Sequence, residues 1–564
     1  MLGDFIIPQD GLPLRESAAR TDIAYAPLYL NADARDGVTV AGKPSLTIDQ
    51  AAAQLTREGA GWSATSAGVV VTYAYRADAP SSLPGDISGF SRFGAAQISQ
   101  AEMALRAWSD VANITFVRVG AGTGDSDSYA NNATMLLGNY SSGYQSAAAF
   151  AYPPGSRAAG STDGDVWVNV SLDYNARPQV LGYGGYVLVH EVGHAIGLSH
   201  PSNYDPAQGV ALYVSDAAYF EDSRQYTVMS YFSATSTGAV LPGYPAAPLL
   251  DDIAAAQRLY GANMSTRTED TVYGFHSNAD RPWLAVTSQA TKFLAAIWDG
   301  GGRDTLDFSG YSDLQTIDLR AGSFSDVGGY IGNLAIARGV DIENAIGGTG
   351  PDTLIGNALD NVLAGNGGGG AIYGGAGADT LSEQWGASYL RGEEGDDSIV
   401  GGSSFDDING NQGADTASGG AGNDWVVGGK DNDRLSGDAG DDLVLGNLGS
   451  DTLSGGDGSD TLRGGQDNDL IAGGAGDDWL SGDRGADTLV GGAGADIFHS
   501  FGGADLDVIL DFHFDEGDRL RLDVGSIWRI SQLGADTVVD LDGGAQVILL
   551  GVNAAGLSGD WIGV

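Results

Sequence analysis

The stretch His190–Pro201, HEVGHAIGLSHP, carries side chains whose types and spacing suit a metal ion. Three of the six histidines of the chain lie in it, at positions 190, 194 and 200. On a helix, His190 and His194 lie one turn apart on the same face, so both imidazoles can reach one zinc ion. The spacing therefore predicts a zinc site on a helix.

Two neighbouring residues indicate a catalytic rather than a structural site. Glu191 directly follows the first histidine and is placed to take a proton from a water molecule on the metal. Gly197 can adopt the positive φ with which helices often end, and the turn brings His200 back as a third ligand. Three imidazoles leave one coordination position open for water, which is typical of catalytic zinc.

A methionine-containing turn, YTVMSY at Tyr226–Tyr231, follows about thirty residues after the third histidine. A short HExxH match can arise by chance, and Met229 alone fits ordinary core filling. The extended pattern HExxHxxGxxH followed by such a turn is the metzincin signature. The two motifs together favour the zinc interpretation over chance.

The composition points to several domains and to bound cations. A chain of 564 residues is too long for one compact core. Its formal charge of −46 argues against nucleic acid and anionic membranes as partners. Because 42% of the residues are hydrophobic, disorder is a poorer explanation of this charge than cation binding.

Several classes of structure are excluded or disfavoured. The absence of cysteine excludes disulfides and thiolate metal sites. No apolar run approaches the roughly 18 residues of a membrane helix, so no membrane span is expected. The first residues, MLGDFIIPQDGLPLRE, lack a basic segment and a sustained apolar core, which argues against a cleaved secretory signal.

The first half of the chain alternates predicted helices and strands, as an α/β domain with a sheet behind the zinc helix would. Ala147–Tyr152 could be an edge strand that binds an extended peptide beside the cleft, or a plain surface strand. The other predicted elements are helices at Lys43–Trp62 (N-cap Thr47 or Asp49), Ala95–Val111 and Pro248–Tyr260, and strands at Val69–Tyr75, Ile114–Val119, Ala133–Leu137 and Val166–Val170.

A nine-residue repeat runs without a break from Gly347 to His499, with units such as GGAGADTLS and GGDGSDTLR. Position six is usually Asp and position eight is apolar, which is the signature of a calcium-binding parallel β-helix. Two units make one coil, so calcium should lie between units eighteen residues apart. The predicted ligands form two columns: Asp379, Asp397, Asp415, Asp433, Asp451, Asp469 and Asp487 on one side, and Asp406, Asp424, Asp442, Asp460, Asp478 and Asp496 on the other.

The repeat block holds 27 acidic and 5 basic residues. Without calcium these carboxylates repel one another, so we expect the block to be largely unfolded. A flexible Gly-rich linker would not need Asp and an aliphatic residue in register. Three units lack the pattern, with Asn361 or Gly370 at position six or Glu383 at position one, and calcium should be weak or missing there.

Taken together, the chain resembles the serralysins, secreted zinc metalloproteases of Gram-negative bacteria with a calcium-binding RTX repeat. Residues 43–365 and the repeat carry the resemblance, although the array is longer than usual and the terminal DWIGV is only similar to the usual ending. Beyond the zinc motif and VMSY, it rests on WSDVANITF (108–116), APLLDDIAAAQRLYGAN (247–263), TVYGF (271–275), DFSGYS (307–312), GSFSDVGG (322–329) and IENAIGG (342–348).

The resemblance implies a set of site residues. Zinc would be held by His190, His194 and His200, with Tyr231 as a further ligand that moves away to help stabilise the transition state, and Glu191 would be the general base. Two further calcium sites are implied at the start of the C-terminal half, at Arg267, Glu269, Thr271, Asp299, Gly301, Gly302 and Asp304, and at Glu343, Gly348, Gly350 and Asp352.

The resemblance also implies a multidomain fold, a metzincin-type α/β zinc protease domain followed by an all-β parallel β-roll. The expected regions are an N-terminal arm or propeptide (1–40), the catalytic domain (41–262), a β-rich segment (263–346), the RTX roll (347–499) and a C-terminal region with a secretion signal (500–564). It implies an extracellular monomer that cleaves proteins, leaves the cell through a type I ABC exporter and binds a small periplasmic proteinase inhibitor.

These observations predict a secreted zinc endopeptidase. A calcium-dependent surface or adhesion protein, in which the repeat is the functional part, is the alternative, and it would predict a degenerate zinc motif. A repeat-bearing lipase would need a GxSxG elbow after a strand, and Gly322–Ser325 does not match it.

Overall fold

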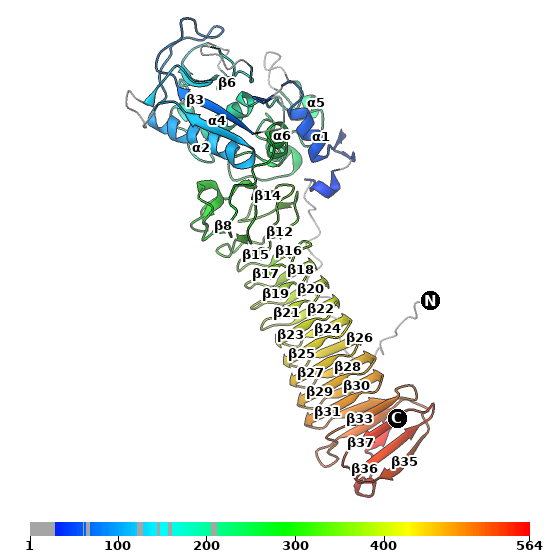
Figure 1. Cartoon of the computed structure of the whole chain (residues 1–564). Coiled ribbons are helices and arrows are strands. Elements are labelled where there is room, and N and C mark those ends of the chain that lie inside the picture. Colours follow the sequence, from blue (N-terminus) through cyan, green and yellow to red (C-terminus); the bar gives the residue numbers. More distant parts are fainter. Residues whose placement is uncertain are drawn as a thin grey trace.

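The computed structural model describes residues 29–35, 37–59, 61–63, 68–120, 128–143, 147–155, 161–204 and 211–564. The molecule is elongated, with a mixed α/β domain at one end, a long stack of strands in the middle and a small β region at the other end (Figure 1). Within these residues no helix is both long enough and apolar enough to span a bilayer.

The N-terminal domain contains a five-stranded sheet with the order β4-β3-β5-β7-β6. Strands β3, β4, β5 and β7 are parallel, and β6 is an antiparallel edge strand. The edge position predicted for residues 147–152 is therefore confirmed. The strands are β3 (Val69–Tyr75), β4 (Ile114–Arg118), β5 (Met135–Tyr140), β6 (Ala149–Ala151) and β7 (Val166–Asn169).

Six α-helices lie among the described residues, and two of them, α2 and α6, begin and end close to the predicted residues. The six helices are α1 (Ile48–Leu55), α2 (Ala95–Val111), α3 (Asp173–Ala176), α4 (Tyr183–Ala195), α5 (Tyr213–Asp216) and α6 (Leu250–Tyr260), with short 3-10 helices η2 (Ala32–Ala34), η6 (Ala234–Thr237), η7 (Pro282–Leu284) and η8 (Ala554–Gly556). The zinc motif begins inside α4, as its spacing predicts.

Helix α1 is shorter than the predicted Lys43–Trp62. Thr47 caps it in a reciprocal pair with Gln50, as one of the two predicted caps. Upstream, β1 (Thr39–Val40) and β2 (Lys43–Pro44) form a hairpin. Downstream, the carbonyl of Leu55 accepts the N–H of Ser199 at 2.7 Å, so the loop that carries the third histidine takes the place of another helical turn. This contact could not be read from the local sequence.

Residues 29–35 are integrated into the fold. The guanidinium of Arg35 is buried and donates to both carboxylate oxygens of Asp251 at 2.8 and 3.0 Å. Tyr29 donates to Asp326 at 2.9 Å, so this segment contacts the N-terminal domain and the β region that follows it. The rest of the predicted arm, residues 1–28, lies outside the described residues.

The C-terminal half is a parallel β-roll whose strands pair in steps of eighteen residues, such as Thr380 with Ser398 and Ser398 with Thr416. Two nine-residue units therefore form each coil, as predicted. One sheet contains β8 (Val272–Phe275), β9 (Ala285–Val286), β11 (Thr305–Asp307), β15 (Asn344–Ile346), β17 (Val362–Ala364), β19 (Thr380–Ser382), β21 (Ser398–Val400), β23 (Thr416–Ala421), β25 (Arg434–Ala439), β27 (Thr452–Asp457), β29 (Leu470–Ala475), β31 (Thr488–Ala493), β33 (Leu506–Ile509), β35 (Trp528–Leu533), β36 (Asp536–Leu541) and β37 (Gln546–Leu549).

The opposite sheet has twelve strands and ends with the last strand of the chain. It contains β12 (Thr316–Asp318), β16 (Asp352–Ile355), β18 (Gly370–Ala376), β20 (Ser388–Glu394), β22 (Asp406–Gln412), β24 (Trp425–Lys430), β26 (Leu443–Leu448), β28 (Thr461–Gln466), β30 (Trp479–Arg484), β32 (Ile497–Ser500), β34 (Arg519–Leu522) and β38 (Ile562–Gly563). Residue 440 illustrates why the turns need glycine: it has φ +140°, and a Cβ there would lie 1.4 Å from the carbonyl oxygen of Gly422.

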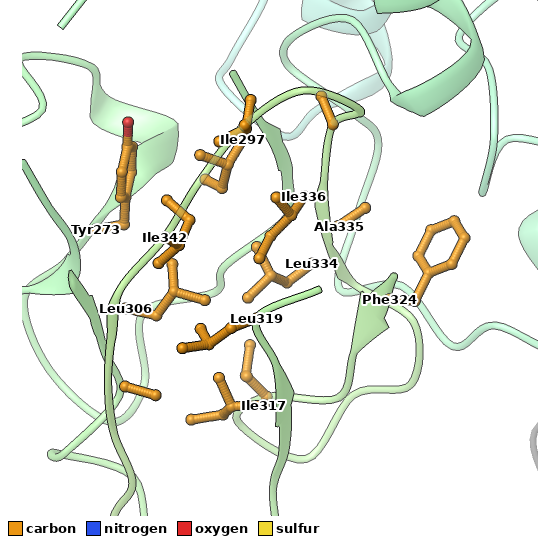
Figure 2. Close-up of a cluster of buried hydrophobic side chains, with 14 of the residues drawn as sticks. Tyr273, Ile297, Leu306, Ile317, Leu319, Phe324, Leu334, Ala335, Ile336 and Ile342 are labelled. Carbon is orange, nitrogen blue, oxygen red and sulfur yellow. The ribbon is translucent and has the colours of Figure 1, made fainter. Parts of the chain in front are cut away.

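A hydrophobic core runs continuously from the N-terminal domain into the roll. Between the two, Tyr273, Ile297, Leu306, Ile336 and other buried side chains converge from strands of several sheets (Figure 2). A third small sheet of β10 (Ala295–Ile297), β14 (Leu334–Ile336) and β13 (Phe324–Ser325) borders this cluster. Along the roll, the position-eight side chains continue the core, because each points between the two sheets.

Candidate metal centre

Helix α4 and the turn after it bring the three predicted histidine ligands together. The Nε2 atoms of His190 and His194 are 3.1 Å apart, those of His194 and His200 are 3.1 Å apart, and those of His200 and His190 are 3.3 Å apart. Gly197 has φ +107°, as the predicted turn requires. Among the described residues, this is the group of histidines and carboxylates that could hold a metal ion.

Backbone carbonyls set the tautomers of two of these rings. Nδ1 of His190 lies 2.8 Å from the carbonyl oxygen of Val228, and Nδ1 of His194 lies 2.7 Å from that of Leu198. A carbonyl can only accept, so each Nδ1 carries the hydrogen and each Nε2 presents a lone pair. The lone pairs of His190 and His194, on nitrogens 3.1 Å apart, would repel one another, and a cation bound between them removes that repulsion. The histidines therefore fit zinc.

Electrostatics keep these rings neutral. Burial, followed by the neighbouring His194, lowers the pKa of His190 to about 3. Burial also lowers the pKa of His194 and, together with the other two histidines, that of His200. Neutral imidazoles are the form that binds metals, so the site is ready for a cation at neutral pH.

Glu191 lies beside the histidines, and its side chain is buried. Its Oε2 has no hydrogen-bond partner among the described residues, and burial raises its pKa to about 8. A buried carboxylate without a partner is unfavourable, unless a cation or a substrate group compensates it. Such a group suits proton transfer near neutral pH.

The methionine-containing turn, residues 226–231, places Tyr231 in the cleft and Met229 in the core. The ring of Tyr231 lies 4.5 Å from that of His200 and is partly exposed in the cleft. Met229 is fully buried below the helix, where a Cβ on Gly193 would lie 2.6 Å from its sulfur. Met229 is therefore packing beneath the centre rather than a ligand.

Asp252 of α6 anchors the turn, and sequence reasoning did not single it out. Its carboxylate accepts Thr227 Oγ1 at 2.5 Å and the N–H groups of Val228 and Leu249 at 2.7 and 2.9 Å. Asp252 accepts the N–H of Val228, and the carbonyl of Val228 orients His190, so Asp252 acts on the metal centre through the backbone of one residue. Two adjacent aspartates at the start of an otherwise apolar helix were the signal available in the sequence.

Two more groups hold the loop of the third histidine. Arg57 donates to the carbonyls of His200 and Pro201 and, at 2.6 Å, to Asn203 Oδ1. Trp62 Nε1 donates to the carbonyl of Ala195 at 2.8 Å, which satisfies one of the last carbonyls of α4. Neither contact is visible in the sequence, because both partners lie more than 130 residues away.

A cleft of about 1000 Å³ contains the three histidines, Glu191 and Tyr231. One wall is the edge strand β6 with Phe150, and another is the loop after α4. The free edge of β6 can pair with an extended peptide laid across the histidines. The site thus combines a metal centre, a buried carboxylate and a peptide-sized groove.

Comparison with known proteins agrees with this geometry. A family model described as Matrixin matches residues 92–213, and one described as Peptidase M10 serralysin C terminal matches residues 262–550. Metallopeptidase AprA of Pseudomonas marginalis is 46% identical over 361 residues, which cover 62% of this chain and 73% of that protein. Serralysin C of Dickeya chrysanthemi is 47% identical over 324 residues, which cover 57% of this chain and 66% of that protein.

The chain belongs to the serralysin family. It is a zinc metalloendopeptidase with a matrixin-type domain followed by a parallel β-roll. The expectation of an enzyme is confirmed, and the adhesion-protein alternative is not favoured. The calcium ligands and the role of each active-site residue stay predictions.

In this serralysin the predicted calcium residues of the repeat form two columns along the roll. Oδ1 of each aspartate accepts the N–H of the residue eighteen positions earlier, as Asp397 does from Asp379 at 2.9 Å. Oδ2 has no partner among the described residues in twelve of the thirteen, Asp406 being the exception because it accepts Gly402 N–H at 2.7 Å. The unpartnered oxygens of a column all occupy the same place in successive turns.

The structure also gathers the other predicted calcium residues of the serralysin into two groups, but Glu343 lies beside Asp304 in the first group rather than with Asp352 as predicted. Thr271 N–H donates to Asp304 Oδ1 at 2.8 Å, and Asp304 N–H donates to Glu343 at 2.6 Å. Gly301 N–H donates to Asp299 at 2.8 Å, Arg267 lies 3.9 Å from that carboxylate, and a Cβ on Gly302 would meet the carbonyl of Glu269. In the second group, Gly348 N–H donates to Asp352 at 2.5 Å, while Gly350 lies against the carbonyl of Asp313.

Among the irregular units, Glu383 takes the place of a missing aspartate. Gly370 and Ser388 stand at position six of two units eighteen residues apart, and the carboxylate of Glu383 lies over Gly365 where an aspartate lies over the first glycine in regular units. Its Oε1 accepts the N–H of Gln384 at 2.9 Å. The sequence did not predict that the Glu383 carboxylate would occupy the place of the missing aspartate.

Proposed function

We propose that the chain hydrolyses peptide bonds of extracellular proteins, with zinc held by His190, His194 and His200. The observation that supports this most is the convergence of three Nε2 atoms beside the buried carboxylate of Glu191, whose Oε2 has no partner among the described residues. Bound zinc would supply Lewis acidity, which polarises the scissile carbonyl and makes a water molecule more acidic.

The residues of the chain would each have a separate task. Strand β6 pairs with the substrate backbone and sets the scissile bond over the histidines. Glu191 takes a proton from the attacking water and passes it to the leaving amine. Tyr231 would be a further ligand of bound zinc and, when substrate binds, would donate a hydrogen bond to the developing oxyanion.

Casein hydrolysis by purified, calcium-loaded protein tests this proposal. We expect 1,10-phenanthroline to abolish activity and added zinc to restore it, because the chelator removes the metal that the histidines hold. Folded protein with a full complement of zinc and calcium that cleaves neither casein nor short peptides would contradict the proposal. Such a result would favour the repeat as the functional part.

We also propose that the β-roll binds calcium through the two aspartate columns and through the two sites near Asp304 and Asp352. Buried, unpartnered carboxylate oxygens in register are the ligands that calcium prefers. Calcium outside the cell would then fold the roll after export, which suits a route through a type I ABC exporter with residues 500–564 as the signal. The monomeric state, the small periplasmic inhibitor and the predicted domain boundaries belong to the same proposal.

Any removable leader would end before Tyr29. The buried ion pair of Arg35 with Asp251 ties this segment to the catalytic part, and breaking a buried pair is strongly destabilising. N-terminal sequencing of the secreted protein tests this, and a mature chain that begins after Arg35 would contradict it.

A further inference from the structure

We propose that Asp222 is a positioning residue that holds the Tyr231 phenol at its resting place beside His200. The inference rests on the proposed role of Tyr231 as a metal ligand. Asp222 lies between α5 and the methionine-containing turn, and its carboxylate is completely buried.

Three hydroxyl groups donate to this carboxylate. Ser230 Oγ lies 2.7 Å and Tyr204 OH 3.0 Å from Oδ1, and Ser202 Oγ lies 2.5 Å from Oδ2. Ser202 and Tyr204 follow the third histidine, whereas Ser230 directly precedes Tyr231. Asp222 therefore joins the two segments that carry His200 and Tyr231.

Tyr204 transmits this connection to the phenol. Its ring lies 5.0 Å from the ring of Tyr231 and 5.4 Å from that of His200, while those two rings are 4.5 Å apart. Ser230, which directly precedes Tyr231, is bonded to the same carboxylate. The carboxylate thus fixes the backbone of Tyr231 on one side and the ring that packs against it on the other.

The proposal explains why a buried carboxylate is placed here without an Arg or Lys side chain bonded to it. The ammonium of Lys43, which acts on this carboxylate through its charge, donates its hydrogen bonds to the carbonyls of Val214 and Ala217 instead. Among the described residues, the carboxylate of Asp222 accepts hydrogen bonds from hydroxyl groups alone. It can therefore release one of these hydroxyls without leaving an unpaired cation. Tyr231 can therefore leave its resting place at the expense of local hydrogen bonds alone.

Copper(II)-substituted protein tests the proposal, because a phenolate bound to copper gives a visible charge-transfer band that imidazoles do not give. We expect wild type to show the band, Tyr231→Phe to lack it, and Asp222→Leu, in which carbons replace both carboxylate oxygens, to lose most of it while copper stays bound. With peptide substrates, Asp222→Leu should lower kcat about tenfold with little change in KM.

Ser230→Ala and Thr227→Val form a matched pair that keeps the test decisive if Asp222→Leu does not fold. Both hydroxyls belong to the methionine-containing turn, and each donates to a buried carboxylate: Ser230 to Asp222 and Thr227 to Asp252. Each also accepts the backbone N–H of the residue two positions later. Ser230→Ala should weaken the band and Thr227→Val should not. Equal losses in the two variants, or a wild-type band in Asp222→Leu, would overturn the proposal. If the wild-type protein lacks the band but hydrolyses peptides normally, Tyr231 is not a ligand and the proposed role of Asp222 is wrong. The proposed protease function would not be affected by that result.

Discussion

At the residue scale, the active site depends on carboxylates that are buried for different purposes. Glu191 has an oxygen with no partner among the described residues, whereas Asp252 is fully hydrogen-bonded. The first arrangement is unfavourable for stability and suits proton transfer, and the second is favourable for stability and suits positioning. The two residues should therefore respond to substitution in opposite ways.

Glu191→Gln should lower kcat/KM by about 10² to 10⁴-fold, because the amide cannot accept the proton of the attacking water. Zinc content and thermal stability should not fall, because the neutral amide is less unfavourable when buried. Peptide hydrolysis, metal analysis and thermal unfolding measure these quantities. Glu516→Gln, at the far end of the molecule, is the control, and an active Glu191→Gln protein would refute the assignment.

Asp252→Ala should destabilise the catalytic part by about 3 kcal/mol, since it leaves three buried donors unpaired. It should also weaken zinc binding by about 10 to 100-fold, because it frees the backbone of Val228, whose carbonyl orients His190. Thermal unfolding and competition with a chelator measure the two effects. Asp49→Ala changes an exposed aspartate paired with Arg338 and should alter stability by less than about 0.5 kcal/mol. Equal effects in both variants would contradict the role of Asp252.

At the scale of elements, the position of an aspartate in the nine-residue repeat decides whether its side chain is buried or exposed in the roll. Asp441 and Asp442 are neighbours in one turn, yet Asp442 is buried with an unpartnered oxygen whereas Asp441 is exposed. The alternation arises because each turn presents position six toward the adjacent coil and position five toward solvent. The pair offers a direct test of the calcium columns.

Asp442→Ala should raise the calcium concentration needed to fold the roll, because it removes a ligand between two coils. Asp441→Ala should leave that concentration nearly unchanged, since it removes only an exposed carboxylate that accepts Ser459 N–H. Circular dichroism during a calcium titration measures both. A shift of the same size in the two variants would argue for general charge reduction instead of specific ligation.

At the scale of the whole molecule, the charge of −46 makes the fold dependent on cations and on pH. Burial raises the pKa of Asp379, Asp415 and Asp433 to about 7 and that of Asp469 to about 8. Unfolded aspartate has a pKa near 3.9, so the calcium-free folded roll binds more protons than the unfolded chain between those values. Protonation of these aspartates therefore stabilises the calcium-free roll fully below about pH 4, and this stabilisation is lost as the pH rises to about 7 or 8.

Calcium-free protein should accordingly unfold at a lower urea concentration at pH 8 than at pH 5, and calcium at pH 8 should reverse the loss. Urea titrations followed by circular dichroism, at constant ionic strength, measure this. A calcium-free roll that is more stable at pH 8 would contradict the protonation argument.

The sequence by itself determined the zinc helix, the methionine-containing turn, the ends of β3 and α2 and the eighteen-residue coil. In each case the information lies in residues close together in the chain: a helix places positions four apart on one face, and a nine-residue turn repeats its own geometry. Only the tertiary structure decided the end of α1 at Leu55, the burial of Arg35, and the roles of Arg57, Asp222 and Asp252. Those residues act through partners that are mostly far away in the chain, and an isolated Asp or Arg in a sequence does not indicate which distant backbone group it will meet.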